Sequence, residues 1–229
     1  MIPTVEKMPE VFWRNICCSS GRPKWEERIY HEMLVFPNDY IRSLVSVANK
    51  EGIFTPFGLS NYDHALPFII WLADHFRLRK EQLRILDVGC FSGLSLKFLQ
   101  KKGFPESFGI DNDPRCLGLW KSLDLRTVRL IGLEEMGSVF ESGSFDVIMC
   151  IGVIHEEIDK KESLAATALL LHDSLIGGAS RLLSRGGILI LRSPAAWRDK
   201  KILERIEKEG FKILFLNTEQ TEIFAQKKG

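Results

Sequence analysis

Two acidic residues at the ends of apolar runs are the side chains whose types and spacing most suggest chemistry in this sequence. The first run ends at Asp87 and passes through Val88 into a glycine-containing turn over residues 89–93. The second run, 107–110, ends at Asp111, 24 positions after the first carboxylate. On a doubly wound α/β sheet this arrangement is typical of a nucleoside cofactor site. The sequence therefore predicts such a site, and the surrounding motifs must indicate which nucleoside it takes.

An alternation of strand and helix patterns from residue 83 onward predicts the elements that position these carboxylates. Strands are expected at 83–88, 107–111, 126–131, 145–150, 187–192, 211–216 and 221–226, with helices at about 92–102, 114–121, 162–184 and 198–209. This alternation is typical of a parallel sheet with crossover helices. Only four residues separate the last two strands. That is too short for a parallel crossover, so these strands are expected to form an antiparallel hairpin.

The first 80 residues have a helical pattern without strands. The pattern predicts a helix that stops at Phe36-Pro37, a second that Asn38 caps and Gly52 ends, and a third that Asp63 can cap. Residues 1–76 hold 12 of the 23 aromatic residues of the chain. We therefore expect two parts, a helical segment over 1–80 and an α/β domain over 81–229.

Composition limits the classes of function. The chain has 31 basic and 30 acidic residues without a basic block, so a nucleic-acid partner is not expected, although a small local patch stays open. No apolar run approaches the ~20 residues of a membrane span. The N-terminus lacks a signal-peptide pattern, and the five cysteines have no Cys-x-x-Cys spacing. We expect a cytoplasmic protein without a disulfide framework or a metal site.

Four motifs in order resemble those of the class I S-adenosylmethionine-dependent methyltransferases: Leu86–Gly93, Gly109–Asn112, Ser144–His155 and Leu183–Ile190. That family characteristically carries the terminal hairpin. The resemblance implies an α/β fold, a doubly wound, mostly parallel seven-stranded sheet with an antiparallel C-terminal hairpin and an N-terminal helical lid. It also implies S-adenosyl-L-methionine as the cofactor and a small molecule as the methyl acceptor.

The resemblance also implies which residues contact the cofactor. S-adenosylmethionine has no phosphate, so the turn after the first strand must let the backbone approach the methionyl group, which glycine favours. Asp87 would lie near the ammonium, and Asp111 would accept both ribose hydroxyl protons. Asn112 and the loop 132–134 would border the adenine. The implied contacts are Tyr62, Asp87, Gly89, Cys90, Phe91, Gly93, Asp111, Asn112, Leu133, Glu134, Cys150 and Ile151. Plainer interpretations stay open, since either aspartate can cap a helix and the glycines can serve an ordinary turn.

The catalytic candidates follow the fourth predicted strand, where the methyl donor would point. His155 is a candidate general base or substrate ligand, and Glu156 is the second candidate. The alternative is an exposed acidic helix start, where glutamates are favoured by the helix dipole.

Two departures from the family pattern keep other functions open. Phe91 stands where the family usually has a middle glycine, and Leu133 where an acidic residue often follows the third strand. Both favour a rival function, a catalytically silent methyltransferase-like binding or scaffold protein. A nicotinamide-dependent oxidoreductase is a third alternative, disfavoured by the missing G-x-G-x-x-G pattern and by the terminal hairpin.

Overall fold

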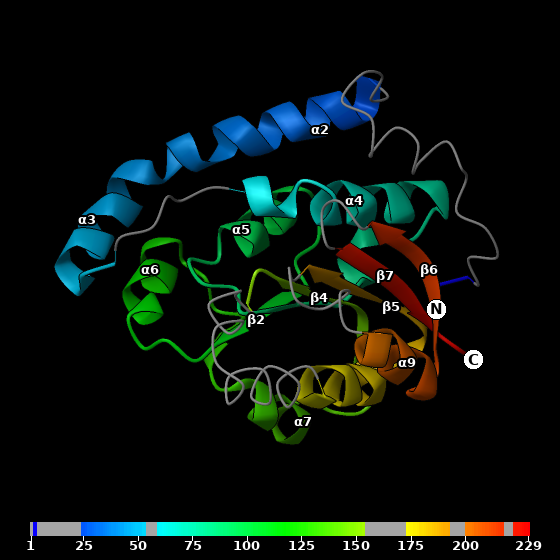
Figure 1. Ribbon diagram of the computed structural model, residues 1–229. Helices are drawn as coiled ribbons and strands as arrows, with labels where there is room; N and C mark the ends of the chain where they lie inside the picture. The colour runs from blue at the N-terminus through cyan, green and yellow to red at the C-terminus, as the bar shows by residue number, and fades with distance from the viewer. Residues whose placement is uncertain (1, 4–23, 54–58, 154–172, 193–199, 218–221) are drawn as a thin grey trace.

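The computed structural model describes residues 2–3, 24–53, 59–153, 173–192, 200–217 and 222–229 (Figure 1). Seven strands in these ranges form one sheet in the order β3-β2-β1-β4-β5-β7-β6. Their bounds are β1 Ile85–Val88, β2 Ser107–Asp111, β3 Val128–Leu130, β4 Phe145–Ile151, β5 Leu183–Arg192, β6 Phe211–Asn217 and β7 Glu222–Lys227. The first five are parallel, and β7 runs antiparallel to both β5 and β6. The predicted fold, including the terminal hairpin, is confirmed.

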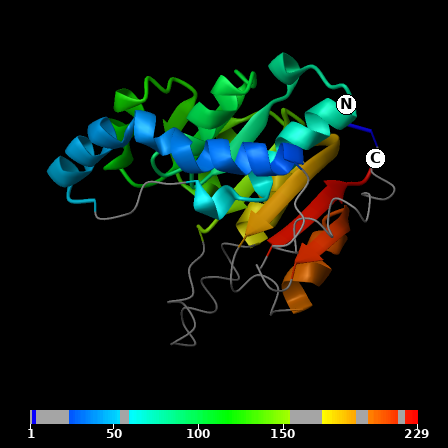
Figure 2. The same cartoon turned by 90° about the horizontal axis from the view of Figure 1, so that it is seen from above.

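Helices cover both faces of the sheet (Figure 1). On one face lie α4 (Ala65–His75), α5 (Leu94–Lys101) and α6 (Cys116–Ser122), and α2 (Lys24–Val35) and α3 (Ile41–Glu51) lie further out (Figure 2). On the other face lie α7 (Met136–Val139), a helical stretch over 173–182 and α9 (Lys200–Lys208). The short 3-10 helices are η1 Phe36–Asp39, η2 Ser60–Tyr62, η3 Lys80–Gln82 and η4 Leu133–Glu135.

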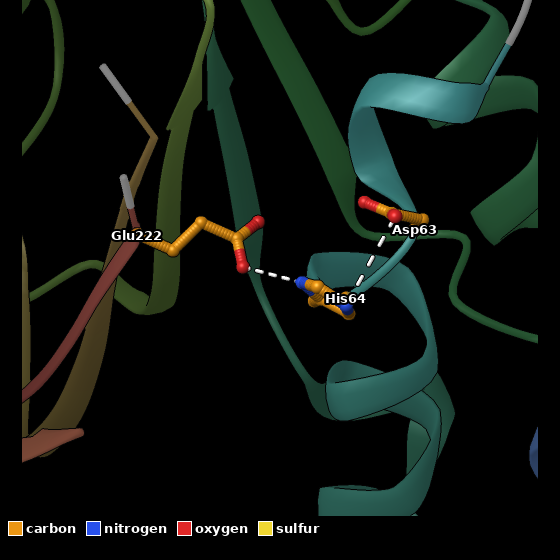
Figure 3. A group of neighbouring side chains, drawn as sticks. All are labelled: Asp63, His64 and Glu222. Carbon is orange, nitrogen blue, oxygen red and sulfur yellow. Dashed lines mark hydrogen bonds and ion pairs between the residues drawn. The ribbon is translucent and has the colours of Figure 1, made fainter. Parts of the chain in front are cut away.

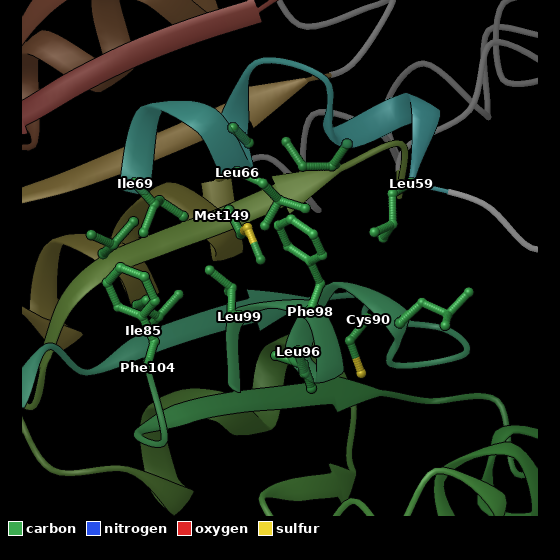
Figure 4. Close-up of a cluster of buried hydrophobic side chains, with 14 of the residues drawn as sticks. Leu59, Leu66, Ile69, Ile85, Cys90, Leu96, Phe98, Leu99, Phe104 and Met149 are labelled. Atoms are coloured by element: carbon green, nitrogen blue, oxygen red, sulfur yellow. The ribbon is translucent and has the colours of Figure 1, made fainter. Parts of the chain in front are cut away.

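Alternation along the strands explains the two apolar cores. Because successive strand side chains point to opposite faces, Ile85 and Met149 enter the core under α4 and α5, whereas Leu86 and Ile148 enter the opposite core. Figure 4 shows the first core, in which Leu66 and Ile69 of α4 and Phe98 and Leu99 of α5 lie in one cluster with Ile85 and Met149 of the sheet. The ring of Phe68 packs edge-on against Phe224 of β7, with centroids 5.0 Å apart. The N-terminal helices are thus anchored to the sheet by buried apolar surface.

Several predicted boundaries were wrong. The helix before β5 ends at 182, and the strand begins at Leu183 rather than at 187. A register shift separates the pair Phe145–Leu183 from Val147–Ile188, so the Gly186-Gly187 pair forms a bulge inside the strand. Neither predicted cap forms, because Asn38 lies in η1 and the N-cap of α4 is His64.

Gly52 ends α3 in the left-handed region at φ 67°, as predicted. None of the helices in the described ranges combines the length and the apolar character that crossing a membrane requires.

Candidate cofactor site

A cavity of about 930 Å³ opens at the carboxyl ends of β1, β2 and β4, within the size range of small-molecule sites. The order of the sheet reverses between β1 and β4, which is where open α/β sheets bind their ligands. The described lining residues are Gly52, Ile53, Leu59, Asn61, Tyr62, Val88, Gly89, Cys90, Phe91, Ser92, Leu94, Ser95, Ile110, Asp111, Asn112, Asp113, Arg115, Ile131, Leu133, Glu134, Ile151, Gly152 and Val153. Residues before position 63 therefore form one wall, and the strand ends form the other.

The turn after β1 has three residues with positive φ. Gly89 and Gly93 adopt φ 74° and 78°, and a Cβ atom there would lie 2.2 Å from Val153 and 2.3 Å from Leu125, respectively. Neighbouring side chains as well as the backbone conformation thus exclude a side chain at both positions. Phe91 adopts φ 44°, which is costly for a bulky residue. Its carbonyl accepts a hydrogen bond from Nε1 of Trp120 at 2.6 Å, which helps to hold this conformation.

Asp111, at the end of the neighbouring strand β2, holds this turn by a direct hydrogen bond. Oδ2 accepts the backbone N–H of Phe91 at 2.8 Å, and Oδ1 accepts the backbone N–H of Asp113 at 3.0 Å. Asp111 is partly exposed and lines the cavity. Each carboxylate oxygen has a second lone pair, so the side chain can still accept two hydroxyl protons from a ligand.

Asp87 lies behind the cavity wall rather than in it. Oδ2 accepts hydrogen bonds from the hydroxyls of Tyr62, at 3.0 Å, and Ser95, while Oδ1 is buried and has no hydrogen-bond partner among the described residues. Burial raises the pKa of Asp87 to about 7, against the lowering effect of the bonds from Ser95 and Tyr62, and the charge of Asp111 adds to the rise. The ordinary value for aspartate is near 4. Asp87 is therefore a carboxyl whose charge a nearby cation would stabilise.

The cysteines of the site are held as thiols. Burial, followed by the charge of Asp87, raises the pKa of both Cys90 and Cys150 well above the usual range. Since the thiolate is the nucleophilic form, neither sulfur is prepared for attack at neutral pH. Cys90 lines the cavity, and Cys150 packs in the core of the opposite face.

Carboxylates dominate the charged groups of the lining. The described lining holds three carboxylates, Asp111, Asp113 and Glu134, and one cation, Arg115. Nη2 of Arg115 is paired with Oδ2 of Asp113 at 2.6 Å. Leu133 and Glu134 lie in η4, and Glu134 is exposed at the rim. The described lining therefore suits a cationic nucleoside better than a diphosphate.

Most of the predicted contacts converge on the cavity. Tyr62, Gly89, Cys90, Phe91, Asp111, Asn112, Leu133, Glu134 and Ile151 line it, whereas Asp87, Gly93 and Cys150 lie behind it. His155 and Glu156 lie outside the described residues. The sequence reasoning missed Ser95 and Arg115, and the signal for Ser95 was its place two residues after the last glycine of the turn. It also missed Asn61, beside the predicted Tyr62.

The cavity fits S-adenosylmethionine by three features of its residues. The left-handed glycine turn leaves the backbone at Gly89, which lines the cavity, without an intervening side chain. Oδ1 of Asp87, which no side chain or backbone group of the described ranges binds, and the acidic lining match a ligand that carries an ammonium and a sulfonium. Asp111 at the end of β2 matches the ribose hydroxyls.

Comparisons with known proteins agree with the fold. A family model described as "Methyltransferase domain" matches residues 86–191. A curated relative, the ribosomal protein L11 methyltransferase of Agathobacter rectalis, is 26% identical over 211 residues, which make up 90% of this chain and 60% of the relative. The chain thus spans less than two thirds of the length of that relative.

Solved structures are similar to this chain at low sequence identity. An S-adenosylmethionine-dependent methyltransferase from Mesorhizobium loti superposes with a TM-score of 0.51 at 14% identity, over 73% of this chain and 98% of the other. A TehB-like SAM-dependent methyltransferase from Corynebacterium glutamicum gives a TM-score of 0.48 at 17% identity, over 74% and 98% of the two chains.

The strand order, with its reversed β7, defines the α/β fold of the class I methyltransferases. Over residues 86–191 the chain is thus similar to a methyltransferase domain in sequence and in fold.

Proposed function

We propose that the protein transfers a methyl group from S-adenosylmethionine to a small-molecule acceptor. The observation that carries this proposal is the acidic cavity at the ends of β1, β2 and β4, with the carboxylate of Asp111 on its wall. When bound, the cofactor supplies an electrophilic methyl group on a sulfonium. The protein contributes alignment of the acceptor, exclusion of water and a proton acceptor where the acceptor atom needs one.

Each predicted contact has a proposed task. Asp111 accepts the ribose hydroxyl protons, while Asn112, Leu133 and Glu134 border the adenine. The turn 89–93, including Cys90 and Phe91, faces the methionyl part, and Ile151 lines the floor at the end of β4. Asp87 lies behind the cavity wall and orients Tyr62 and Ser95 by hydrogen bonds, and its charge favours a cationic ligand. Gly93 and Cys150 pack behind the wall and support it.

Residues 1–80 are proposed to form a lid and the acceptor pocket, separate from the domain over 81–229. Tyr62 supports this because its hydroxyl crosses to Asp87 on β1, and Ile53, Leu59 and Asn61 line the same cavity. Limited proteolysis with and without S-adenosylhomocysteine tests the lid. Ligand should slow cleavage around residues 19–21 and 52–60, and an unchanged pattern would contradict the proposal.

His155 and Glu156 remain the proposed catalytic pair, with His155 as the proton acceptor. Their support is positional, since β4 ends at Ile151 beside the cavity and both residues follow within five positions. We also propose a cytoplasmic location, supported by the cysteines of the described ranges, Cys90, Cys116 and Cys150, which are buried free thiols.

A protein acceptor is the second candidate, because the curated relative is named for its action on a ribosomal protein. The balanced charge of the chain still gives no support to a nucleic-acid acceptor. The scaffold alternative requires Phe91 and Leu133 to have closed the site. Its support is weak, because the turn is formed with Phe91 at φ 44° beside an open cavity.

Transfer of a labelled methyl group separates these functions. The protein is incubated with methyl-labelled S-adenosylmethionine and a cell extract divided by ultrafiltration into small molecules and macromolecules. We expect label in the small-molecule fraction. Label confined to protein would favour the second candidate. Cofactor binding without transfer to either fraction would favour the scaffold, and binding of NADH in place of S-adenosylhomocysteine would favour an oxidoreductase.

A further inference from the structure

A buried polar network lies beside the cavity, under the ends of β5 and β7. It joins Asp63 and His64, just before α4, to Arg192 at the end of β5 and Glu222 at the start of β7. Figure 3 shows three of its members, Asp63, His64 and Glu222. His64 and Glu222 are fully buried, and Nδ1 of His64 lies 2.5 Å from Oε2 of Glu222. Burying ionisable groups is costly even when they are paired, so such a network suggests a task beyond stability.

Asp63, His64 and Glu222 are residue types that bind cations, and their ligand atoms lie within 4.8 Å of one another. However, the two carboxylates face different ring nitrogens: Glu222 faces Nδ1, and Asp63 lies 3.9 Å from Nε2 (Figure 3). A protein cation is also present already. Nη1 of Arg192 lies 2.8 Å from Oδ1 of Asp63 and 3.7 Å from Oε1 of Glu222. The network is therefore better arranged to hold the chain than to bind a metal ion.

Arg192 holds the turn that carries Tyr62. Its Nη1 donates to the carbonyl oxygen of Asn61 at 2.6 Å and to Oδ1 of Asp63 at 2.8 Å. The guanidinium therefore binds the residues immediately before and after Tyr62. The hydroxyl of Tyr62 then donates to Asp87 at 3.0 Å. Asn61 and Tyr62 line the cavity, whereas Arg192 is not among its described lining residues.

The backbone of Arg192 is tied to the opposite wall of the same cavity. Its carbonyl accepts the N–H of Gly152 at 2.9 Å, and Arg192 pairs with Ile151 across β4 and β5. On its other side Arg192 pairs directly with Glu222 of β7. One residue thus joins the end of β4 to the turn 61–63, and Glu222 supports its guanidinium from behind.

We propose that Arg192 is a positioning residue for the cofactor site, whose guanidinium fixes the turn 61–63 so that Tyr62 stays bonded to Asp87. This inference rests on the proposed function, since it assigns Arg192 to the same site. This positioning role of Arg192 can be distinguished from a general contribution to the stability of the fold. If Arg192 acts through Tyr62, removing Arg192 should matter much less once the hydroxyl of Tyr62 is absent.

A double-mutant cycle on ligand binding tests this link. S-adenosylhomocysteine affinity is measured by calorimetry for the wild type, Arg192→Met, Tyr62→Phe and the double variant. We expect each single variant to bind about 10-fold more weakly, which corresponds to about 1.4 kcal/mol, and the double variant to bind about as weakly as Tyr62→Phe alone. Arg205→Met is the matched control, because Arg205 is also partly buried and paired with acidic side chains, but lies on α9. It should bind like the wild type.

Two results would overturn the proposal. One is wild-type affinity in Arg192→Met. The other is a loss of affinity in the double variant equal to the product of the two single fold-losses, which would mean that the two residues act independently. If Arg192→Met does not fold, Arg192→Lys and Asp63→Asn replace it in the cycle, since both keep a polar side chain of similar size. If the wild type itself does not bind S-adenosylhomocysteine, the proposed function fails. The coupling between Arg192 and Tyr62 is then measured from the unfolding free energies of the same four proteins, where additivity would overturn the link.

Discussion

The backbone N–H of Phe91 donates a 2.8 Å hydrogen bond to Oδ2 of Asp111, so the carboxylate at the end of β2 fixes the turn at the end of β1. The other oxygen accepts the N–H of Asp113. Asp111 thus supports the cavity wall and also lines the cavity. The same two oxygens, Oδ1 and Oδ2, hold the backbone and would accept the hydroxyl protons of a ligand.

Removing this carboxylate should weaken cofactor binding. We predict that Asp111→Ala reduces the affinity for S-adenosylhomocysteine by roughly 1.5–3 kcal/mol, the scale of hydrogen bonds to a charged group. Asp111→Asn keeps one acceptor oxygen for a backbone amide and should lose less. Calorimetry on both variants, with the exposed Asp124→Ala as control, provides the comparison. Equal affinities in Asp111→Ala and the wild type would remove Asp111 from the site.

Phe91 should carry a measurable backbone cost. At φ 44° an alanine is disfavoured relative to glycine by about 1 kcal/mol, and both replacements delete the same ring. We therefore predict that Phe91→Gly is more stable than Phe91→Ala, as measured by urea unfolding. The opposite order would mean that the turn relaxes to negative φ when the ring is lost, and that the hydrogen bonds to Asp111 and Trp120 do not hold it.

Asp87 should make stability depend on pH. Its pKa is about 7 in the folded protein and near 4 in the unfolded chain, so between these values the folded state holds more protons. Stability from this group is greatest below pH 4 and falls as pH rises towards 7, by at most about 1.4 kcal/mol per unit. Asp87→Asn stays neutral and removes this fall. Its free energy of unfolding, minus that of the wild type, should rise from pH 4 to 7 and then level off, as urea titrations at several pH values can measure. A difference independent of pH would contradict the assignment.

The sheet could be predicted from the sequence because its signals are local. Asp87 and Asp111 mark strand ends, and the short connection after β6 requires an antiparallel β7. The start of β5 was missed because the Gly186-Gly187 pair resembles a turn, whereas pairing with β4 makes it a bulge. Asp63 was assigned to a cap because it precedes α4, but the distant Arg192 binds it instead.

The part of the site that could be predicted also has local sequence signals. Motif residues such as Asp111 and Gly89 reached the cavity, since strand ends meet at one edge of a sheet. The position of Asp87 behind Tyr62 and Ser95 could not be predicted, because it depends on contacts between residues 25 and 8 positions apart in different elements. The network of His64 and Glu222 spans 158 positions and leaves no local pattern.

His155 gives a prediction about the chemical step. If it accepts a proton from the acceptor, the rate should rise with pH through a pKa in the range of histidine, near 6.5. His155→Ala should then lose roughly 100-fold in turnover while keeping its affinity for S-adenosylhomocysteine. The measurement is a pH–rate profile with the acceptor found by methyl labelling. A flat profile together with near-normal turnover in the variant would exclude His155 as the base.

The most direct test of the account is calorimetry of the wild-type protein with S-adenosylhomocysteine. The acidic cavity, the left-handed turn and Asp111 predict one site per chain with micromolar affinity, and a melting temperature that rises with ligand concentration by mass action. Asp111→Ala should bind more weakly, by the same roughly 1.5–3 kcal/mol. If the folded wild-type protein releases no heat and shows no shift in melting temperature at millimolar ligand, the proposed methyltransferase function is wrong.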